Sequence, residues 1–238
     1  MWNNYLNIPV MSWLGQFTAV SAPLNQIVHY MAGSHLLKGL PMMGMLWFYW
    51  LKENKDTTNT RRIIIATLIG TLFAVLIARA TNTFGPYQPR PFSNPELLYH
   101  FYAGLPPRET QALYLWSSFP SDHAALFYSL ATGIFLISRS VGSFLFVYVT
   151  IFIALPRIYL GLHYPTDILA GGILAVACVG LCTRKFITNI YDVQYTTLLN
   201  KYPAAFQAIL FMASAEISML FIDLRSLVHG IVKYFPYH

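Results

Sequence analysis

Three short polar segments carry most of the residues in this sequence that could do chemistry, and each lies beside a long apolar run. They are "ARATNTFGPYQPRPF" at 78–92, "FPSDHA" at 119–124 and "PRIYLGLHYPTDILAGG" at 156–172. Together they hold three arginines, two histidines and two carboxylates. A charged group at the end of an apolar segment is costly unless it is paired or functional. Three such segments therefore indicate a shared polar site.

The residue types in these segments suit the transfer of a phosphoryl group. Arg90 and Arg157 offer planar guanidinium forks that match phosphate oxygens. Ser121 and the backbone N–H groups around Asp122 open a predicted helix, and a helix N-terminus binds anions. Two histidines can divide the work, because one can attack phosphorus while the other protonates the leaving oxygen.

His163 and Asp167 are four residues apart where the chain enters another predicted helix, so their side chains can meet. A carboxylate beside an attacking histidine fixes its tautomer and stabilises the imidazolium. We expect neither a metal nor a cofactor. The sequence has no HExxH or Asp-rich pattern, and two converging arginines would repel a cation.

The composition is that of a membrane protein. Hydrophobic residues make up 56% of the 238 residues, charged residues only 10%, and the mean hydropathy is +0.50. Soluble domains carry about 25% charged residues. The formal net charge of +6 is scattered over short loops without a basic stripe, which suits anionic lipid head groups and argues against a nucleic-acid partner.

The apolar runs predict about six transmembrane helices in an all-α fold. The predicted spans are about 27–51, 62–79, 122–138, 142–157, 165–181 and 203–222. We divide the chain into an interfacial segment (1–26), a membrane domain (27–185) and a C-terminal extension (186–238) that contains the sixth span. Lys38, early in the first span, is expected to extend its ammonium towards the membrane surface.

Positive charge predicts the orientation of these spans. Lysine and arginine are concentrated in loop 52–62, at Arg139 and after the fifth span, so we place these three regions in the cytoplasm. Both termini and all three polar segments then lie on the outer side. The predicted site therefore opens at the outer membrane surface.

The three segments resemble the signature of the type 2 phosphatidic acid phosphatase family, which comprises membrane lipid phosphatases related to vanadium haloperoxidases. That signature is Lys-x6-Arg-Pro, then Pro-Ser-Gly-His, then Ser-Arg-x5-His-x3-Asp. The spacing of Arg157, His163 and Asp167 matches the third motif. The resemblance covers roughly residues 20–185, and "PSDH" is similar to the variant in bacterial undecaprenyl pyrophosphate phosphatases of this family.

The resemblance implies a role for each site residue. His163 is the nucleophile that forms a phosphohistidine, Asp167 orients it, and His123 is the general acid. The phosphate is bound by Arg90, Arg157, Ser121 and the backbone of Asp122.

Three positions depart from the family signature. Thr83 stands where the family has lysine, and Arg79, one helical turn earlier, is a candidate to replace it. Asp122 replaces a glycine, and its carboxylate can hold His123 protonated. Pro156 replaces a serine, which removes one hydroxyl donor.

We therefore expect an integral protein of the bacterial inner membrane whose site faces the periplasm or exterior. Its expected reaction is hydrolysis of undecaprenyl pyrophosphate to the monophosphate. Arg79 or Arg108 could hold the phosphate that is not transferred. Phosphatidylglycerophosphate, phosphatidic acid and lipid A are alternative substrates. A haloperoxidase and a non-catalytic lipid-binding or transport protein are the rival functions. The sequence does not predict an oligomeric state.

Overall fold

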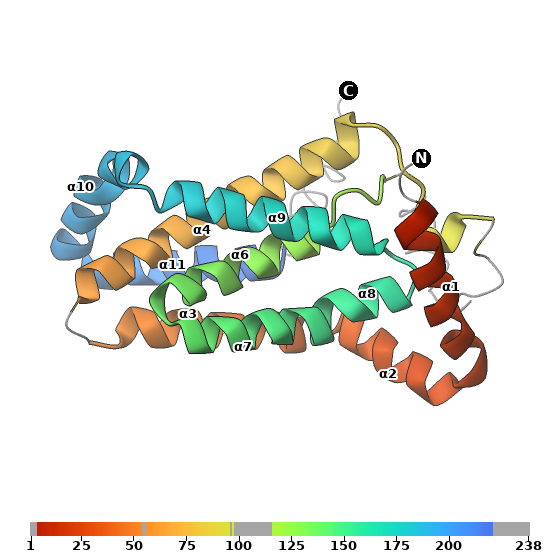
Figure 1. Cartoon of the computed structure of the whole chain (residues 1–238). Coiled ribbons are helices and arrows are strands. Elements are labelled where there is room, and N and C mark those ends of the chain that lie inside the picture. The colour runs from red at the N-terminus through yellow and green to blue at the C-terminus, as the bar shows by residue number, and fades with distance from the viewer. Residues whose placement is uncertain (1–3, 54–55, 96, 98–115, 221–238) are drawn as a thin grey trace, which may run out of the picture.

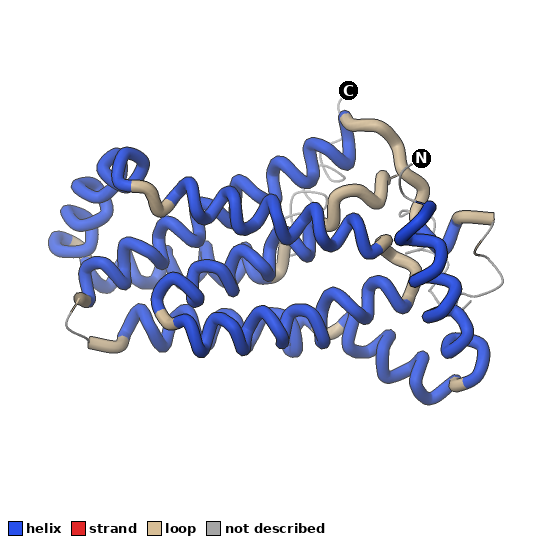
Figure 2. Tube along the Cα trace, in the orientation of Figure 1, coloured by secondary structure: helices blue, strands red, loops and turns tan. Residues whose placement is uncertain are grey.

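Helices make up all the regular secondary structure in residues 4–53, 56–95, 97 and 116–220, which are the residues that this computed structural model describes (Figure 2). The prediction of an all-α fold is confirmed for this part of the chain. The elements are α1 (Asn4–Val20), α2 (Ala22–Gly33), α3 (His35–Leu51), α4 (Thr57–Phe84), the 3-10 turn η1 (Pro91–Ser93), α6 (Asp122–Ile137), α7 (Arg139–Val149), the π-helical turn η3 (Thr150–Ala154), α8 (Leu155–Tyr159), α9 (Pro165–Cys182), α10 (Lys185–Lys201) and α11 (Pro203–Ser218).

Helices α4, α6 and α9 pack against one another along the middle of the molecule (Figure 1). Glycines let their backbones approach closely. A Cβ atom on Gly70 of α4 would lie 2.9 Å from the Cα atom of Val179 in α9, and one on Gly133 of α6 would overlap Thr67 in α4. Small residues at helix crossings are typical of membrane proteins, where close packing replaces the hydrophobic effect.

Three helical segments in the described part of the chain are long and apolar enough to cross a membrane: Thr57–Phe84, Arg139–Tyr159 and Pro165–Cys182. The second of them consists of α7, η3 and α8 in direct succession. Helix α6 is apolar but shorter. These four segments lie where the second to fifth spans were predicted.

The first predicted span, 27–51, is wrong as a single helix. The chain is extended at Ser34 (φ −71°, ψ 109°), where α2 ends and α3 begins. The Ser34 hydroxyl accepts a hydrogen bond from the backbone N–H of Leu37 at 3.2 Å and so caps α3. Serine competes for backbone N–H groups in this way and favours helix starts over helix interiors. As a result, α3 lies along the bundle while α1 and α2 lie at one end of it (Figure 1).

The C-terminal extension contains helix α10, which was not predicted, and α11, which begins at the predicted sixth span. The last residues of that span, 221–222, lie outside the described residues. Arg62 of α4 forms an ion pair with Asp192 of α10 at 2.8 Å. The indole of Trp47 in α3 donates to the hydroxyl of Ser214 in α11 at 3.2 Å. These contacts hold the extension against α3 and α4.

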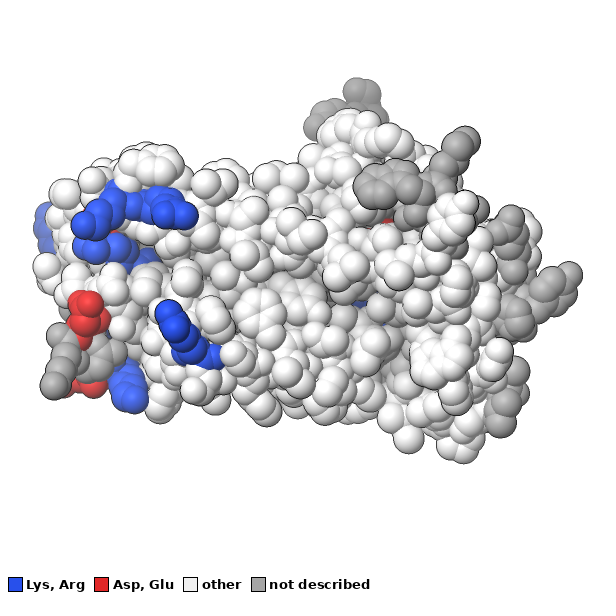
Figure 3. Space-filling view, viewed as in Figure 1, with Lys and Arg blue, Asp and Glu red and all other residues white. Residues whose placement is uncertain are grey.

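Positive side chains gather at the end of the bundle opposite α1 and α2 (Figure 3). The exposed ones at this end include Lys52, Arg139, Arg184 and Lys185. They belong to the three regions predicted to be cytoplasmic, so the fold brings those regions to one end of the molecule. The beginnings of α6 and α9 lie at the other end.

Candidate active site

His163 lies in the short turn between α8 and α9. Gly161 gives this turn its shape, because it has a φ of 68°, a backbone conformation that side chains with a Cβ rarely adopt. The Gly161 carbonyl also accepts a hydrogen bond from the backbone N–H of Phe92 at 3.0 Å. The first polar segment is thereby bound to the third, and Arg90 is brought beside His163.

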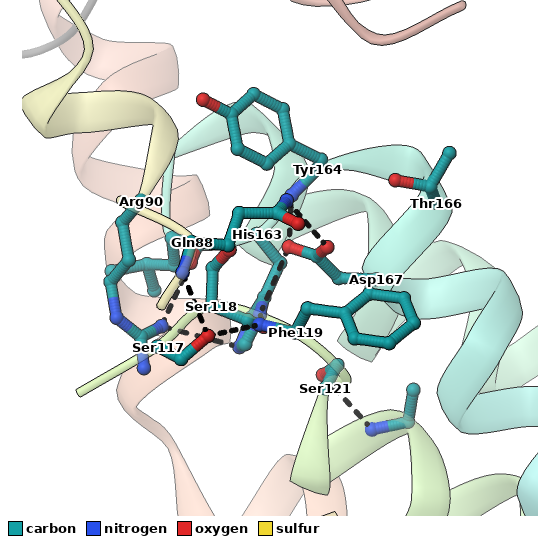
Figure 4. Close-up of polar contacts among 12 residues, drawn as sticks. Gln88, Arg90, Ser117, Ser118, Phe119, Ser121, His163, Tyr164, Thr166 and Asp167 are labelled. Atoms are coloured by element: carbon teal, nitrogen blue, oxygen red, sulfur yellow. Dashed lines mark hydrogen bonds and ion pairs between the residues drawn. The ribbon is translucent and has the colours of Figure 1, made fainter. Parts of the chain in front are cut away.

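The hydrogen bonds of His163 leave one ring nitrogen available for chemistry (Figure 4). Its Nδ1 lies 2.9 Å from the carbonyl oxygen of Ser118, and a carbonyl can only accept, so Nδ1 carries the hydrogen. Nε2 then presents its lone pair and lies 3.5 Å from Nη1 of Arg90. The residue is 3% exposed. Burial, together with the charges of Arg90 and Arg157, lowers the pKa of His163 below its usual 6.5, although Asp167 opposes the shift.

Asp167 is fully buried and holds the turn around His163 (Figure 4). Its Oδ2 accepts a hydrogen bond from the backbone N–H of Tyr164 at 2.8 Å, and its Oδ1 accepts one from Nε2 of Gln88 at 3.2 Å. Oδ2 is 3.7 Å from Nδ1 of His163, within ion-pair distance. The predicted pair is therefore brought together, but the direct hydrogen bond of His163 is to Ser118.

Sequence reasoning missed Ser118 and Gln88. Ser118 acts through its main-chain carbonyl, which gives no signal in the residue type. Gln88 does have a signal, because it is a polar residue two positions before Arg90 in the same segment. Its backbone carbonyl accepts from the N–H of Ser118 at 2.9 Å, so Gln88 links two of the three polar segments.

Arg90 and Arg157 have buried N–H donors that no described residue satisfies. Arg90 is 7% exposed, and its Nη1 donates to the carbonyl of Leu162 at 2.8 Å. The Nε atom of each arginine is buried without an acceptor among the described residues. An unsatisfied buried donor costs about 1–3 kcal/mol. An anion with several acceptor oxygens would remove that cost, and phosphate is such an anion.

The start of α6 is fixed against the start of α9. The N–H of Ser121 donates to the carbonyl of Asp167 at 3.1 Å. The Ser121 hydroxyl is fully buried and caps α6 by accepting from the N–H of Ala124 at 3.3 Å. This hydroxyl oxygen thus has a structural partner, and its predicted contact with phosphate stays a prediction.

His123 and Asp122 form a pair on the first turn of α6. Nδ1 of His123 lies 2.8 Å from Oδ1 of Asp122, so Nδ1 carries a hydrogen and Nε2 is left for a reactant. The other carboxylate oxygen of Asp122 is 3.7 Å from Nε of Arg79.

Two residues considered for the missing family lysine lie in different places. Thr83 is exposed, and its hydroxyl donates to the carbonyl of Arg79 at 2.9 Å. Nε of Arg79 lies 3.7 Å from a carboxylate oxygen of Asp122. Arg108 lies outside the described residues.

The prediction for Lys38 is wrong, because its side chain is 5% exposed and does not reach the surface.

Comparisons with known proteins point to one family. The family model described as the PAP2 superfamily matches residues 80–191, a stretch that contains Arg90 and the whole of the second and third polar segments. The bacitracin transport permease protein BcrC of Bacillus licheniformis is 28% identical over 173 residues, covering 72% of this chain and 76% of the relative. The putative undecaprenyl-diphosphatase YbjG of Escherichia coli is 25% identical over 182 residues, covering 76% and 82%.

Two further matches are more distant or shorter. The lipid A 1-diphosphate synthase of Escherichia coli is 27% identical over 146 residues, which cover 58% of this chain and 57% of the relative. Among solved structures, the crystal structure of LpxE from Aquifex aeolicus matches with a TM-score of 0.47 and 22% identity, covering 74% of this chain and 93% of that one.

Proposed function

The chain belongs to the PAP2 superfamily of membrane phosphatases, and from this premise we propose that it hydrolyses undecaprenyl pyrophosphate to the monophosphate through a phosphohistidine. One observation carries the proposal. The buried His163 has its Nδ1 hydrogen bound to a carbonyl and its Nε2 lone pair beside Arg90. That is the geometry of an imidazole prepared to attack a bound phosphate.

The first step forms the phosphohistidine. Nε2 of His163 attacks the terminal phosphorus, and the bond between that phosphorus and the bridging oxygen breaks. His123 gives the proton on its Nε2 to the bridging oxygen, so the lipid leaves as its monophosphate. Arg90 and Arg157 stabilise the charge on the equatorial oxygens, which is usually the largest single contribution to catalysis of this kind.

The second step restores the enzyme. His123, now neutral, takes a proton from a water molecule as that water attacks the phosphorus. The bond between phosphorus and Nε2 of His163 breaks, and inorganic phosphate leaves. No step in this scheme uses a metal or a cofactor.

The position of the site supports a lipid substrate. The beginnings of α6 and α9 lie at the same end of the bundle, and α9 is long and apolar enough to cross a membrane, so a head group could enter while its tail stays in the bilayer. We place this end at the outer face of a bacterial inner membrane, with about six spans. Positive side chains at the opposite end support that orientation.

The names of the relatives support a lipid that carries phosphate as the substrate, and they leave transport as one rival function. One relative is named as a putative undecaprenyl-diphosphatase and one as a lipid A 1-diphosphate synthase. Phosphatidylglycerophosphate, phosphatidic acid and lipid A remain the alternative substrates. A third relative is named as a transport permease. Transport or binding would need the arginines but neither His163 nor its carboxylate partner.

The proposal is tested by measuring kcat/KM for phosphate release from each of these lipids with detergent-purified protein, since this ratio reports discrimination in the transition state. We expect undecaprenyl pyrophosphate to be the best substrate. A preference of tenfold or more, about 1.4 kcal/mol, for a glycerophospholipid or lipid A would overturn the substrate assignment.

We also expect a chelator to leave the rate unchanged. A rate that is lost in chelator and restored by a divalent cation would refute the metal-free scheme.

A further inference from the structure

Lys38 is a buried cation that the scheme above does not use. It lies in the first turns of α3 and is 5% exposed. Its Nζ donates to the carbonyl of Ala32, near the end of α2, at 2.7 Å, and this is its one hydrogen bond to the described residues. An ammonium group has three donors. A buried ammonium is costly unless its charge is compensated, so Lys38 calls for an anionic partner.

Lys38 and the general acid His123 line the same small cavity, together with His35, Phe127, Ser218, Met219 and Leu220. The charge of Lys38 acts on His123, and those of Asp122 and Arg157 act on Lys38. Lys38 therefore lies on the His123 side of the site. In the proposed reaction His123 protonates the leaving oxygen, so a group beside His123 is beside the leaving group.

A second cation lies at the same corner of the site. Arg79 of α4 is 3.7 Å from Asp122, the carboxylate partner of His123. Its Nη2 donates to the main-chain carbonyl of Leu220, which lines the cavity, at 3.2 Å. Lys38 and Arg79 are thus both bonded to neutral carbonyl oxygens. A phosphate oxygen is a stronger acceptor for either cation, because both partners are then charged.

We propose that Lys38 and Arg79 form a second phosphate subsite on the leaving-group side of His123, and that this subsite makes the enzyme selective for lipid diphosphates. The inference rests on the proposed function. When a diphosphate is cleaved, the leaving group is itself a phosphate that carries negative charge. When a monophosphate ester is cleaved, the leaving group is a neutral alcohol that gives a buried ammonium no partner.

The subsite also explains the departure at Thr83. Threonine carries no charge, and the exposed hydroxyl of Thr83 donates to the Arg79 carbonyl, so Thr83 does not replace the family lysine. Lys38 supplies a cation from a different helix. The cavity has a volume of about 10 Å³, room for one water molecule, so the leaving phosphate must displace part of the wall formed by Met219 and Leu220.

The test compares two substrates that share a tail, farnesyl pyrophosphate and farnesyl monophosphate, in detergent-purified protein. The variants are Lys38→Met, which keeps the side-chain length and removes the charge, and Lys38→Arg, which keeps the charge. Lys52→Met is the matched control, because Lys52 is exposed at the opposite end of the same helix. The readout is the ratio of kcat/KM for the two substrates, which does not depend on the fraction of folded protein.

We expect Lys38→Met to lower the ratio of kcat/KM for the pyrophosphate to kcat/KM for the monophosphate at least tenfold. Lys38→Arg should keep most of the wild-type ratio, and Lys52→Met should leave it unchanged. An unchanged ratio in Lys38→Met, whether both rates fall together or neither falls, overturns the subsite. If the wild type releases phosphate from neither substrate, the proposed function fails first and the subsite with it.

Discussion

At the scale of single residues, the state of His163 is set by a main-chain carbonyl and by burial. The bond from Nδ1 to Ser118 fixes the tautomer without adding a charge, while Asp167 contributes its charge from 3.7 Å. Burial favours the neutral imidazole, which is the form that can attack phosphorus. The residue is thus held ready in both tautomer and protonation state.

This state has a consequence for the pH dependence of the reaction. The pKa of His163 is lowered below 6.5, so the imidazole stays neutral at and somewhat below that pH. It is lost as a nucleophile only when the pH falls through the lowered pKa. We therefore expect the acidic limb of a plot of kcat/KM against pH to lie below 6.5.

The Asp167→Asn variant sharpens this measurement. The Asp167 charge opposes the lowering of the His163 pKa, so its removal should move the acidic limb to still lower pH. An acidic limb above 6.5 in the wild type, or a shift to higher pH in Asp167→Asn, contradicts this description of His163.

The sequence predicted which side chains lie close together better than it predicted the groups that hold them in place. The four-residue spacing of His163 and Asp167 predicted that their side chains meet, and the two lie within ion-pair distance. The carbonyl of Ser118 leaves no pattern in the sequence, since every residue has a carbonyl. The burial of Lys38 was also missed, because an apolar helix with one lysine is compatible with a side chain that reaches the surface and with one that does not.

At the scale of elements, the distance between α6 and α9 positions the two histidines. Gly171, on the second turn of α9, faces the first residues of α6. A Cβ atom at this position would lie 2.5 Å from the carbonyl oxygen of Ser121 and 2.8 Å from Cβ of Ala124. Backbone cannot move aside as a flexible side chain can. The absence of a side chain at Gly171 therefore allows the start of α6, which carries His123, to pack closely against α9.

We expect Gly171→Ala to lower kcat/KM for phosphate release by tenfold or more, because over-packing of this kind costs about 1–3 kcal/mol and would shift the start of α6. Gly172→Ala is the matched control. A Cβ atom there would lie 3.4 Å from the ring of Tyr128, an ordinary contact, and we expect near-wild-type activity. Equal rates in the two variants would contradict this role for Gly171.

Hydrophobic runs located the long helices but not every boundary. The segments Thr57–Phe84 and Pro165–Cys182 each contain an apolar stretch long enough to cross a membrane, so their composition alone predicts them. The break at Ser34 depends on a single cap within a continuing apolar run. Helix α10 was missed because its residues are mixed in polarity, and its place depends on contacts with other helices such as the ion pair to Arg62.

At the scale of the whole molecule, the protein is an integral membrane protein whose exposed positive side chains and candidate active site lie at opposite ends. Exposed lysines and arginines gather at one end (Figure 3), and the beginnings of α6 and α9, which carry His123 and Asp167, lie at the other (Figure 1). Positive charge favours the cytoplasmic side. The separation therefore predicts that the active site faces outward.

Single-cysteine labelling in intact cells measures this orientation. The background lacks Cys178 and Cys182, and the new cysteines are Thr58→Cys and Pro86→Cys, which lie on exposed positions near opposite ends of α4. We expect a membrane-impermeant reagent to label position 86 alone. Labelling of position 58 in unbroken cells would reverse the assignment.

The central claim is that His163 carries the phosphoryl group, and the most direct test is phosphate release by His163→Ala in detergent. The matched control is His29→Ala, since His29 lies in α2 outside the three polar segments. We predict that His163→Ala releases no phosphate above background from undecaprenyl pyrophosphate, while its helical content and elution as a folded protein stay those of the wild type. Near-wild-type phosphate release by His163→Ala would contradict the account.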